Sequence, residues 1–264
     1  AIKIGNDMKL ELHQFPSSHF NEKARWALDY KGLEHSRLNY LPGPHMRPIK
    51  KLSSQRKTPV LKLDNEIVAG SAQIIDRLEQ IAPLPALYPR ESSDRAAALM
   101  LQRELDENLG PSVRLALFSE MLDEGAYFCR QFSEGKSLPV RLAYRAAYPM
   151  AKGLIKKGNG LTGQDAVDAA YKTVADILDE IAEKVSATGF LVGKQFSVAD
   201  LTAAALLAPA VNPPNCDMTK PEPIPKCVVD FLARWSDHPT TAWVLEIYGK
   251  YRAPKSANVE AARN

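Results

Sequence analysis

The spacing of apolar positions divides the chain into two parts. In the first eighty residues, stretches that alternate polar and apolar side chains, typical of strands, are mixed with stretches that repeat every three to four residues, typical of helices. Phe20, Ala24, Ala27 and Leu28 form one such helical face, and Gly32 follows it as a stop signal. The predicted order is strand, helix, strand, turn, strand, strand and helix, at residues 9–13, 18–30, 35–40, 41–44, 60–63, 66–68 and 71–82.

The strand pattern ends at a proline-rich linker, residues 83–90. Beyond it only helical periodicity remains, beginning with a helix that Gly110-Pro111 is expected to break or kink. The clearest helix is 165–185, where a long row of apolar residues lies on one face. The pattern therefore predicts a small α/β domain at residues 1–82 and an all-helical domain at 91–264.

Composition and charge narrow the classes of function. The three cysteines are odd in number and lack the paired spacing of a zinc site. This favours a reducing cytoplasm and argues against both a disulfide framework and a thiolate zinc site. Residues 1–14 lack the apolar stretch of a secretory signal, and the longest uncharged run, 201–216, contains prolines, so we expect no transmembrane segment. Residues 1–85 carry 13 basic and 9 acidic side chains, and this small excess fits a small anionic ligand better than nucleic acid.

Three motifs, in their order along the chain, resemble those of the cytosolic glutathione transferases. Ser18-His-Phe-Asn-Glu-Lys-Ala-Arg25 is similar to the family's helix that opens on a serine and continues with a Lys-x-Arg pair. Gly43-Pro-His45 and then Arg56-Lys-Thr-Pro-Val-Leu61 resemble the Gly-x-His and Lys-x-Pro-x-Leu stretch of the serine-using, theta- and phi-like members. Phe196-Ser-Val-Ala-Asp-Leu201 resembles the capping motif of the helical domain. The resemblance implies an N-terminal thioredoxin-like domain that binds glutathione, a C-terminal helical-bundle domain that binds a hydrophobic electrophile, and a homodimer.

Ser18 stands where the first strand gives way to the first helix. Serine is a common N-cap, and this structural role alone would explain it. The same position suits catalysis, because a helix N-terminus stabilises an anion and a nearby hydroxyl donor eases the ionisation of a thiol. The resemblance implies that Ser18 is catalytic and donates a hydrogen bond to the glutathione thiolate. Ser17 is the alternative if the helix begins one residue earlier.

The resemblance also assigns residues to the rest of glutathione. A cis peptide at Thr58-Pro59 would turn this backbone outward to pair with the cysteinyl residue like an added strand. Ser71 would bind the γ-glutamyl carboxylate, and His45 with Lys57 would bind the glycyl carboxylate. Gly70 departs from the family, which usually has an acidic residue there for the ligand's ammonium group. Each assignment has a structural alternative: Pro59 opens a strand, Ser71 is an N-cap, and His45 is a solvated loop histidine.

Two other groups of residues in the helical domain invite a functional interpretation. Asp200 is charged beside an apolar run, but with Ser197 it forms a capping box, and we assign the pair a structural role. Aromatic residues of a helical domain more often form its core. The resemblance nevertheless implies that this region lines the electrophile pocket, and the candidates are Tyr127, Tyr144 and Tyr148.

Residues 139–157 carry five basic side chains and no acidic one, interleaved with apolar residues. A solvated helix face over ordinary core is the simplest explanation. A second is a helix that lies on a membrane surface, although we expect Pro149 and Gly153 to interrupt it. The third is a flap beside the electrophile site that favours large anionic aromatic ligands.

The leading hypothesis is therefore a detoxifying glutathione S-transferase with glutathione as co-substrate and no metal. The competing hypothesis is a transferase-fold protein that acts as a non-catalytic binding or interaction module. Gly70 favours the second hypothesis, as does the loop 53–56, where the family usually has Asn-Pro-x-Gly. Ser18, His45 and Lys57 favour the enzyme.

Overall fold

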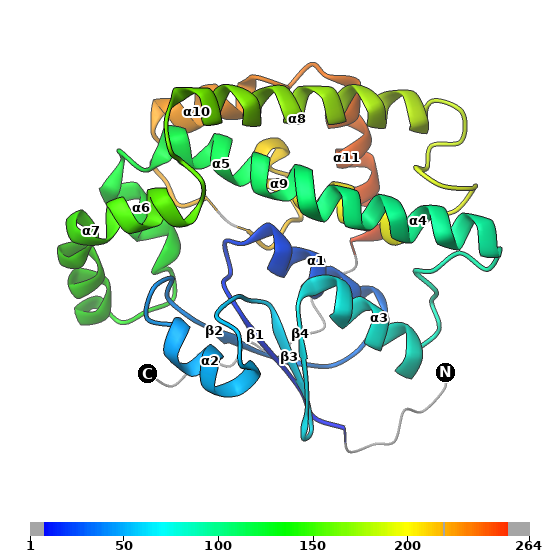
Figure 1. Ribbon diagram of the computed structural model, residues 1–264, viewed down its shortest axis with the longest axis horizontal. Coiled ribbons are helices and arrows are strands. Elements are labelled where there is room, and N and C mark those ends of the chain that lie inside the picture. Colours follow the sequence, from blue (N-terminus) through cyan, green and yellow to red (C-terminus); the bar gives the residue numbers. More distant parts are fainter. Residues whose placement is uncertain (1–7, 219, 253–264) are drawn as a thin grey trace.

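The computed structural model describes residues 8–218 and 220–252 of the chain. Its N-terminal part is a sheet with three helices, and its C-terminal part consists of helices that lie above the sheet in Figure 1. This confirms the predicted α/β-plus-helical organisation. The N-terminal elements are β1 (Leu10–Gln14), α1 (His19–Tyr30), β2 (Ser36–Asn39), α2 (Met46–Ser53), β3 (Val60–Leu63), β4 (Glu66–Ala69) and α3 (Ser71–Ile81).

The four strands pair in the order β2-β1-β3-β4. β1 is parallel to β2, which requires a crossover through α1, whereas β3 and β4 are antiparallel and need only a tight turn. Leu10 and Leu12 of β1 are buried, and so are Leu63 and Leu61, their partners on antiparallel β3. This mixed sheet with its β-α-β and β-β-α halves is the thioredoxin-like arrangement.

Helix α2 is absent from the sequence-based prediction, which has only a loop between residues 44 and 60. The helix has a single buried residue, Ile49, so it lacks the repeated apolar positions that reveal a longer helix. Pro48 lies in its first turn, where a proline is tolerated because the N–H groups there have no intrahelical partner.

The helical part begins with α4, a π-helical turn η1 and α5, which follow one another without a break (Figure 1). The prediction of a break at Gly110-Pro111 is therefore wrong, since the backbone stays helical there and a π turn comes just before it. Gly110 has a packing role, because a Cβ atom there would lie 2.5 Å from Cζ of Phe20 in α1. The elements are α4 (Ser92–Glu104), η1 (Leu105–Leu109), α5 (Gly110–Met121), α6 (Gly125–Phe132), α7 (Leu138–Gly158), α8 (Gln164–Val185), α9 (Val198–Val211), α10 (Lys226–Ala233) and α11 (Pro239–Tyr251).

Helix α7 also runs further than the sequence predicts. Pro149 and Gly153 were expected to interrupt it, yet residues 138–158 form one helix with Pro149 inside. Pro149 is exposed, so water can reach the carbonyl group that loses its intrahelical bond there.

Helix α9 forms the centre of the helical domain. Residues 198–210 are all buried, and the helix packs against α1, α4, α5 and α11. A helix that is apolar on every side belongs in a protein core. None of the helices that the structure describes is both long and apolar enough to cross a membrane.

Helix α1 lies between the sheet and the helical domain, and nearly all of it is buried although it carries four charged residues. Each charge has a partner outside the helix or within it. Lys23 donates to both carboxylate oxygens of Asp106 in the π turn, at 2.6 and 2.8 Å. Arg25 donates to Glu22 at 2.9 Å and to the backbone carbonyl of Pro16 at 3.0 Å.

The remaining contacts of α1 form a buried ion network with residues distant in sequence. Arg252, just after α11, donates to the carboxylates of Glu22 and Asp29 at 2.8 Å and to that of Asp217 at 2.9 Å. Arg37 of β2 donates to Asp29 at 2.8 Å and to Asp217 at 2.6 Å. We call Glu22, Arg25, Asp29, Arg37, Asp217 and Arg252 the ion network.

The positive charges of the ion network control the ionisation of Glu22. Burial alone would raise the pKa of Glu22, but the positive charges of Arg252 and Arg25 outweigh it and the net pKa is lowered. The folded state therefore binds protons at Glu22 less readily than the unfolded state does. This contribution to stability is present above the unfolded pKa, 4.5, and is lost as the pH falls through the lowered one.

We expect Arg252→Ala to lower the free energy of unfolding at pH 7 by about 3–5 kcal/mol, because it leaves buried carboxylates uncompensated. Urea unfolding measures the change. Lys250→Ala is the control, since Lys250 is basic and only two residues away but exposed. The difference between wild type and Arg252→Ala should narrow as the pH falls from 4.5 through the lowered pKa of Glu22. Equal stability of the two proteins at pH 7 would contradict the importance of the ion network.

A capping box fixes the start of α9. The Asp200 carboxylate accepts from the N–H and the hydroxyl of Ser197 at 2.8 and 2.9 Å, and from the N–H of Leu191 at 2.8 Å. The Ser197 hydroxyl accepts from the N–H of Ala199 at 3.3 Å. Burial raises the pKa of Asp200 to about 6, against these hydrogen bonds, which lower it.

Ser197→Ala should therefore lower stability by about 1 kcal/mol, and Asp200→Ala by more, because it removes the acceptor of two buried N–H groups. Thermal unfolding measures both losses. Glutathione affinity, measured by calorimetry on the folded variants, should stay unchanged. A specific loss of affinity at an unchanged melting temperature would assign the pair to the binding site.

Candidate functional site

The pairing of the strands brings most of the predicted site to one edge of the sheet. His13 of β1 pairs with Val60 at the start of β3, and Val60 pairs with Ala69 at the end of β4. The chain segments that adjoin these pairs therefore meet, and the Gly70 N–H donates to the Pro59 carbonyl at 2.9 Å. These segments carry Ser17 and Ser18 after β1, Thr58 and Pro59 before β3, and Gly70 and Ser71 after β4. We call this the sheet-edge site.

The two serines after β1 differ in their partners. Ser18 is the N-cap of α1, with extended backbone (φ −117°, ψ 127°), and its side chain makes no capping hydrogen bond. The Ser17 hydroxyl donates to the carbonyl of Gln131 in α6 at 3.3 Å. Of these two hydroxyls, only that of Ser18 has no partner in the part of the chain that the structure describes.

The neighbouring His19 is buried and ties the start of α1 to the helical domain. Its Nε2–H donates to the carbonyl of Gly110 at 2.9 Å. Burial lowers the pKa of His19 to about 3, so the ring is neutral at physiological pH and can donate from one nitrogen only. His19 therefore positions Ser18 and offers no proton donor to the site.

Thr58 presents its backbone at the same edge. The Thr58–Pro59 peptide bond is cis, as expected. Within residues 8–218 and 220–252, neither the N–H nor the carbonyl of Thr58 has a hydrogen-bond partner, although Val60 two residues later belongs to the sheet. The Thr58 side chain accepts from Nδ2 of the buried Asn21 at 3.2 Å.

Asn21 is a site residue that the sequence analysis missed. It is fully buried one turn after Ser18, and its Oδ1 has no hydrogen-bond partner among the described residues. The spacing of three residues from Ser18 on a helix was the available signal, because such residues share a face. Gln131 was also missed, and its distance of 114 residues from Ser17 left no signal to find it.

Gly70 and Ser71 begin α3 in a conformation that favours glycine. Gly70 has φ +104°, and a Cβ atom there would lie 2.3 Å from Oε1 of Gln73. The amide of Gln73 therefore occupies the space in which a side chain at position 70 would begin. Ser71 is buried and is the first residue of the helix, where backbone N–H groups have no intrahelical partner and the helix dipole is positive.

His45 lies in the loop before α2, and both of its ring nitrogens are engaged. Nδ1 accepts from the N–H of Gly43 at 3.0 Å, and Nε2 donates to the carbonyl of Arg56 at 2.9 Å. Burial lowers the pKa of His45. The imidazole thus connects the segment before α2 to the segment after it, which leads into Lys57, whose side chain is exposed.

The aromatic residues suggested for an electrophile pocket belong largely to the core. The hydroxyl of Tyr148 donates to the carbonyl of Leu122 at 2.6 Å, and its ring lies 5.1 Å from that of Phe128. Tyr127 is also buried, and burial raises its pKa to about 12. Only Tyr144 is half-exposed. These positions do not place Tyr127 and Tyr148 on an open surface.

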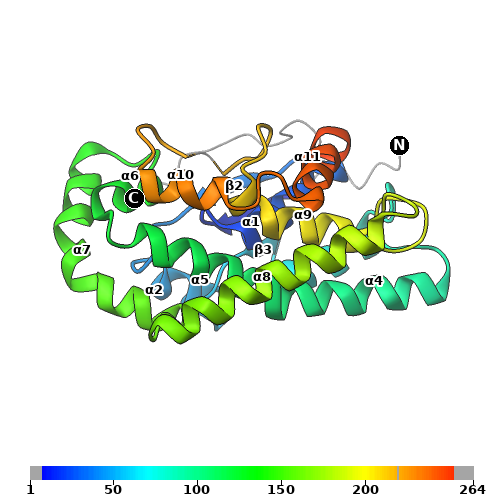
Figure 2. The same cartoon turned by 90° about the horizontal axis from the view of Figure 1, so that it is seen from above.

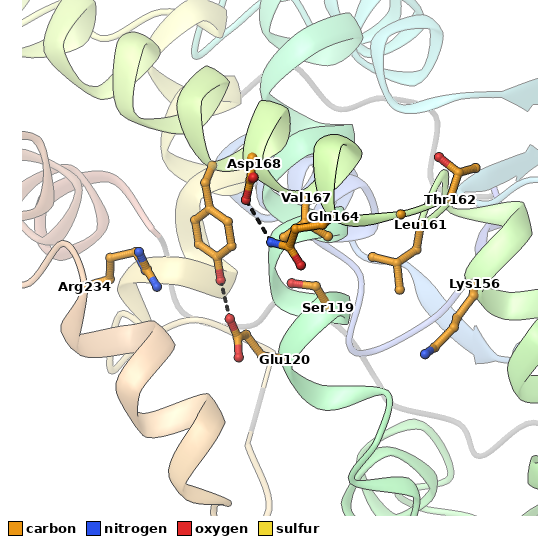
Figure 3. Close-up of a pocket in the computed structure, with 11 residues that line it drawn as sticks. Ser119, Glu120, Lys156, Leu161, Thr162, Gln164, Val167, Asp168 and Arg234 are labelled. Carbon is orange, nitrogen blue, oxygen red and sulfur yellow. Dashed lines mark hydrogen bonds between the residues drawn. The ribbon is translucent and has the colours of Figure 1, made fainter.

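A cavity of about 750 Å³ lies elsewhere, between α5, α8 and the ends of α7 and α10 (Figure 3). The Tyr171 hydroxyl donates to Glu120 at 2.7 Å, and the Arg234 guanidinium lies 4.4 Å from the centre of the Tyr171 ring. Lys156 and Asp168 add one charge of each sign. Its lining contains none of the residues predicted to bind glutathione, and its balanced charges select no particular ligand.

Comparisons with known proteins match both parts of the chain. Residues 12–86 match the N-terminal domain of glutathione S-transferases, and residues 144–223 match their C-terminal domain. Glutathione S-transferase TCHQD of Arabidopsis thaliana is 24% identical over 209 residues, which cover 75% of this chain and 76% of the relative.

Solved structures of glutathione transferases have the same fold. One from Rhodospirillum rubrum superposes with a TM-score of 0.62 at 18% identity, covering 91% of this chain and 88% of the other. One from Phanerochaete chrysosporium, solved with oxidized glutathione, superposes with a TM-score of 0.61 at 13% identity, covering 93% of this chain and 92% of the other. One from Methylobacterium radiotolerans, in complex with glutathione sulfonate, superposes with a TM-score of 0.57 at 20% identity, covering 97% of this chain and 98% of the other. With both of its domains matched and this fold shared, the chain belongs to the glutathione S-transferase family.

Proposed function

We propose that this protein is a serine-type glutathione S-transferase, which activates the thiol of glutathione for attack on a hydrophobic electrophile. The observation that supports this most directly is that, among the described residues, neither the backbone of Thr58 nor the hydroxyl of Ser18 has a partner. Asn21, one turn after Ser18, donates to the Thr58 side chain and so links the two positions. An extended peptide can hydrogen-bond to such a backbone as an additional strand, and this would place its central residue next to the start of α1.

Ser18 is the residue to which we assign thiolate stabilisation. Its hydroxyl donates a hydrogen bond to the sulfur, and the N-terminus of α1 adds a positive partial charge. Both effects lower the pKa of the thiol from its ordinary value of about 8.5, so that more thiolate is present at neutral pH. The thiolate then forms a carbon–sulfur bond with the electrophile while the leaving group departs, and the thiol proton passes to solvent.

The two ends of glutathione would be held by opposite parts of the sheet-edge site. The hydroxyl of Ser71 and the first N–H groups of α3 suit the γ-glutamyl carboxylate, because a helix N-terminus binds anions. The exposed ammonium of Lys57 suits the glycyl carboxylate, and His45 acts indirectly by holding the loop. Gln73 Oε1 lies beside Gly70 and would accept from the ligand's ammonium group, although a neutral acceptor binds a cation more weakly than a carboxylate does.

Calorimetric titration with glutathione, together with conjugation of a chlorodinitrobenzene-type electrophile, tests the proposal. We expect saturable binding and turnover. Lys57→Met should weaken glutathione binding about tenfold by removing a charge-assisted contact. Lys51→Met is the control, because Lys51 is also exposed but lies on α2. Binding without turnover would favour the non-catalytic binding module, and the absence of binding would overturn the site itself.

Ser18→Ala should lower kcat by more than about tenfold while glutathione affinity changes by less than about threefold, because the hydroxyl acts on the sulfur rather than on the ends of the peptide. The pH at which the rate rises should also move upward, since the thiol loses its stabilising donor. Ser17→Ala is the matched control. If turnover falls with Ser17→Ala and survives in Ser18→Ala, Ser18 is only a cap.

A further inference from the structure

Helix α7 lies at the outer edge of the molecule in both views (Figures 1 and 2). One side of α7 packs inward, because Tyr148 is buried and Tyr144 and Ile155 pack against the hydrophobic core. The opposite side carries no described element. The helix is 21 residues long, or about 30 Å at 1.5 Å per residue.

The outward side of α7 is apolar. Four large apolar side chains on this side are exposed, with exposed fractions of 65% for Leu138, 59% for Leu142, 88% for Met150 and 75% for Leu154. Ala146, also exposed, lies between Leu142 and Met150. These positions are four residues apart, so they form one row along the helix surface. A contiguous exposed apolar surface is unusual on a soluble monomer and marks an interaction site. We call this the apolar row.

Basic residues border the apolar row, and α7 itself contains no acidic residue. At about 100° per residue, Arg141, Arg145 and Lys152 lie along one side of the row. Lys152 reaches Asp123 at 2.5 Å. Arg141, Arg145 and Lys157 form no ion pair with any residue that the structure describes, and Arg145 and Lys157 are exposed to solvent.

We propose that α7 docks the protein on an anionic lipid surface, where it lies in the plane of the membrane without crossing it. The apolar row would enter the boundary between headgroups and acyl chains, while the basic side chains would reach the lipid phosphates. A convex helix with flexible Leu and Met side chains offers no groove for a defined protein segment but fits a fluid surface. The proposal is independent of whether the sheet-edge site is catalytic.

Sedimentation with lipid vesicles tests the proposal on the full chain. The protein should bind vesicles of phosphatidylcholine with phosphatidylglycerol at least about tenfold more tightly than vesicles of phosphatidylcholine alone. Binding should weaken as salt rises, because the Debye length falls from about 10 Å at 0.1 M to about 3 Å at 1 M. Melting temperature and glutathione affinity, measured on every variant, show that the fold and the sheet-edge site are intact.

Two pairs of variants separate α7 from general charge or hydrophobicity. Arg141→Glu with Arg145→Glu should abolish binding to anionic vesicles, whereas Lys184→Glu with Lys194→Glu makes the same change in net charge on exposed residues elsewhere and should retain it. Met150→Gln with Leu154→Gln should weaken binding about tenfold, whereas Met100→Gln with Leu245→Gln, two other exposed apolar residues, should not.

Three results would overturn the proposal. The first is no sedimentation with anionic vesicles. The second is an equal loss of binding in the α7 variants and their controls, which would indicate nonspecific adsorption. The third is a halving of the mass in light scattering on replacement of Met150 and Leu154, which would show that the apolar row is an interface between two copies of the chain.

Discussion

The ion network around α1 is the constraint on which the rest of the structure depends. Charged groups removed from water are stable only when each has a partner of opposite sign, and α1 is buried between two domains with its charges in place. The arginine partners of Glu22 and Asp29 outside α1 come from β2 and from the end of α11. The carboxylate of Asp217, in the segment after α9, pairs with the same two arginines, Arg37 and Arg252. The ion network therefore requires the thioredoxin-like part and the helical part to assemble together.

The position of α1 in turn determines the sheet-edge site. The same helix that carries Glu22 and Asp29 begins at Ser18, so the ion network and the His19–Gly110 hydrogen bond fix where that hydroxyl lies. Strand pairing independently fixes Thr58 and Ser71 relative to β1. A site made in this way has rigid walls on the side of the sheet, and its boundary with the helical domain is set by the contact between Ser17 and Gln131.

Much of this arrangement could be predicted from the sequence because it depends on local patterns. Alternation identified the strands, the apolar stripe identified α8, and the Ser197–Asp200 box identified the start of α9. Prediction failed where the local signal was weak or was overridden by packing. Helix α2 buries only Ile49, and Gly110-Pro111 stays helical because α1 packs directly against it through Phe20.

The sequence by itself determined the order of the N-terminal elements other than α2, the family resemblance and the positions of Ser18, Thr58 and Ser71, because each is recorded in spacing along a short stretch of chain. Only the tertiary structure decided that the ring nitrogens of His45 bind the segments on either side of α2, that Tyr148 lies in the core, and that the outward side of α7 is apolar. These facts depend on which face of an element meets another across large sequence separations. Local periodicity shows that a helix has two sides, but the side that is buried is chosen by the packing of the whole chain.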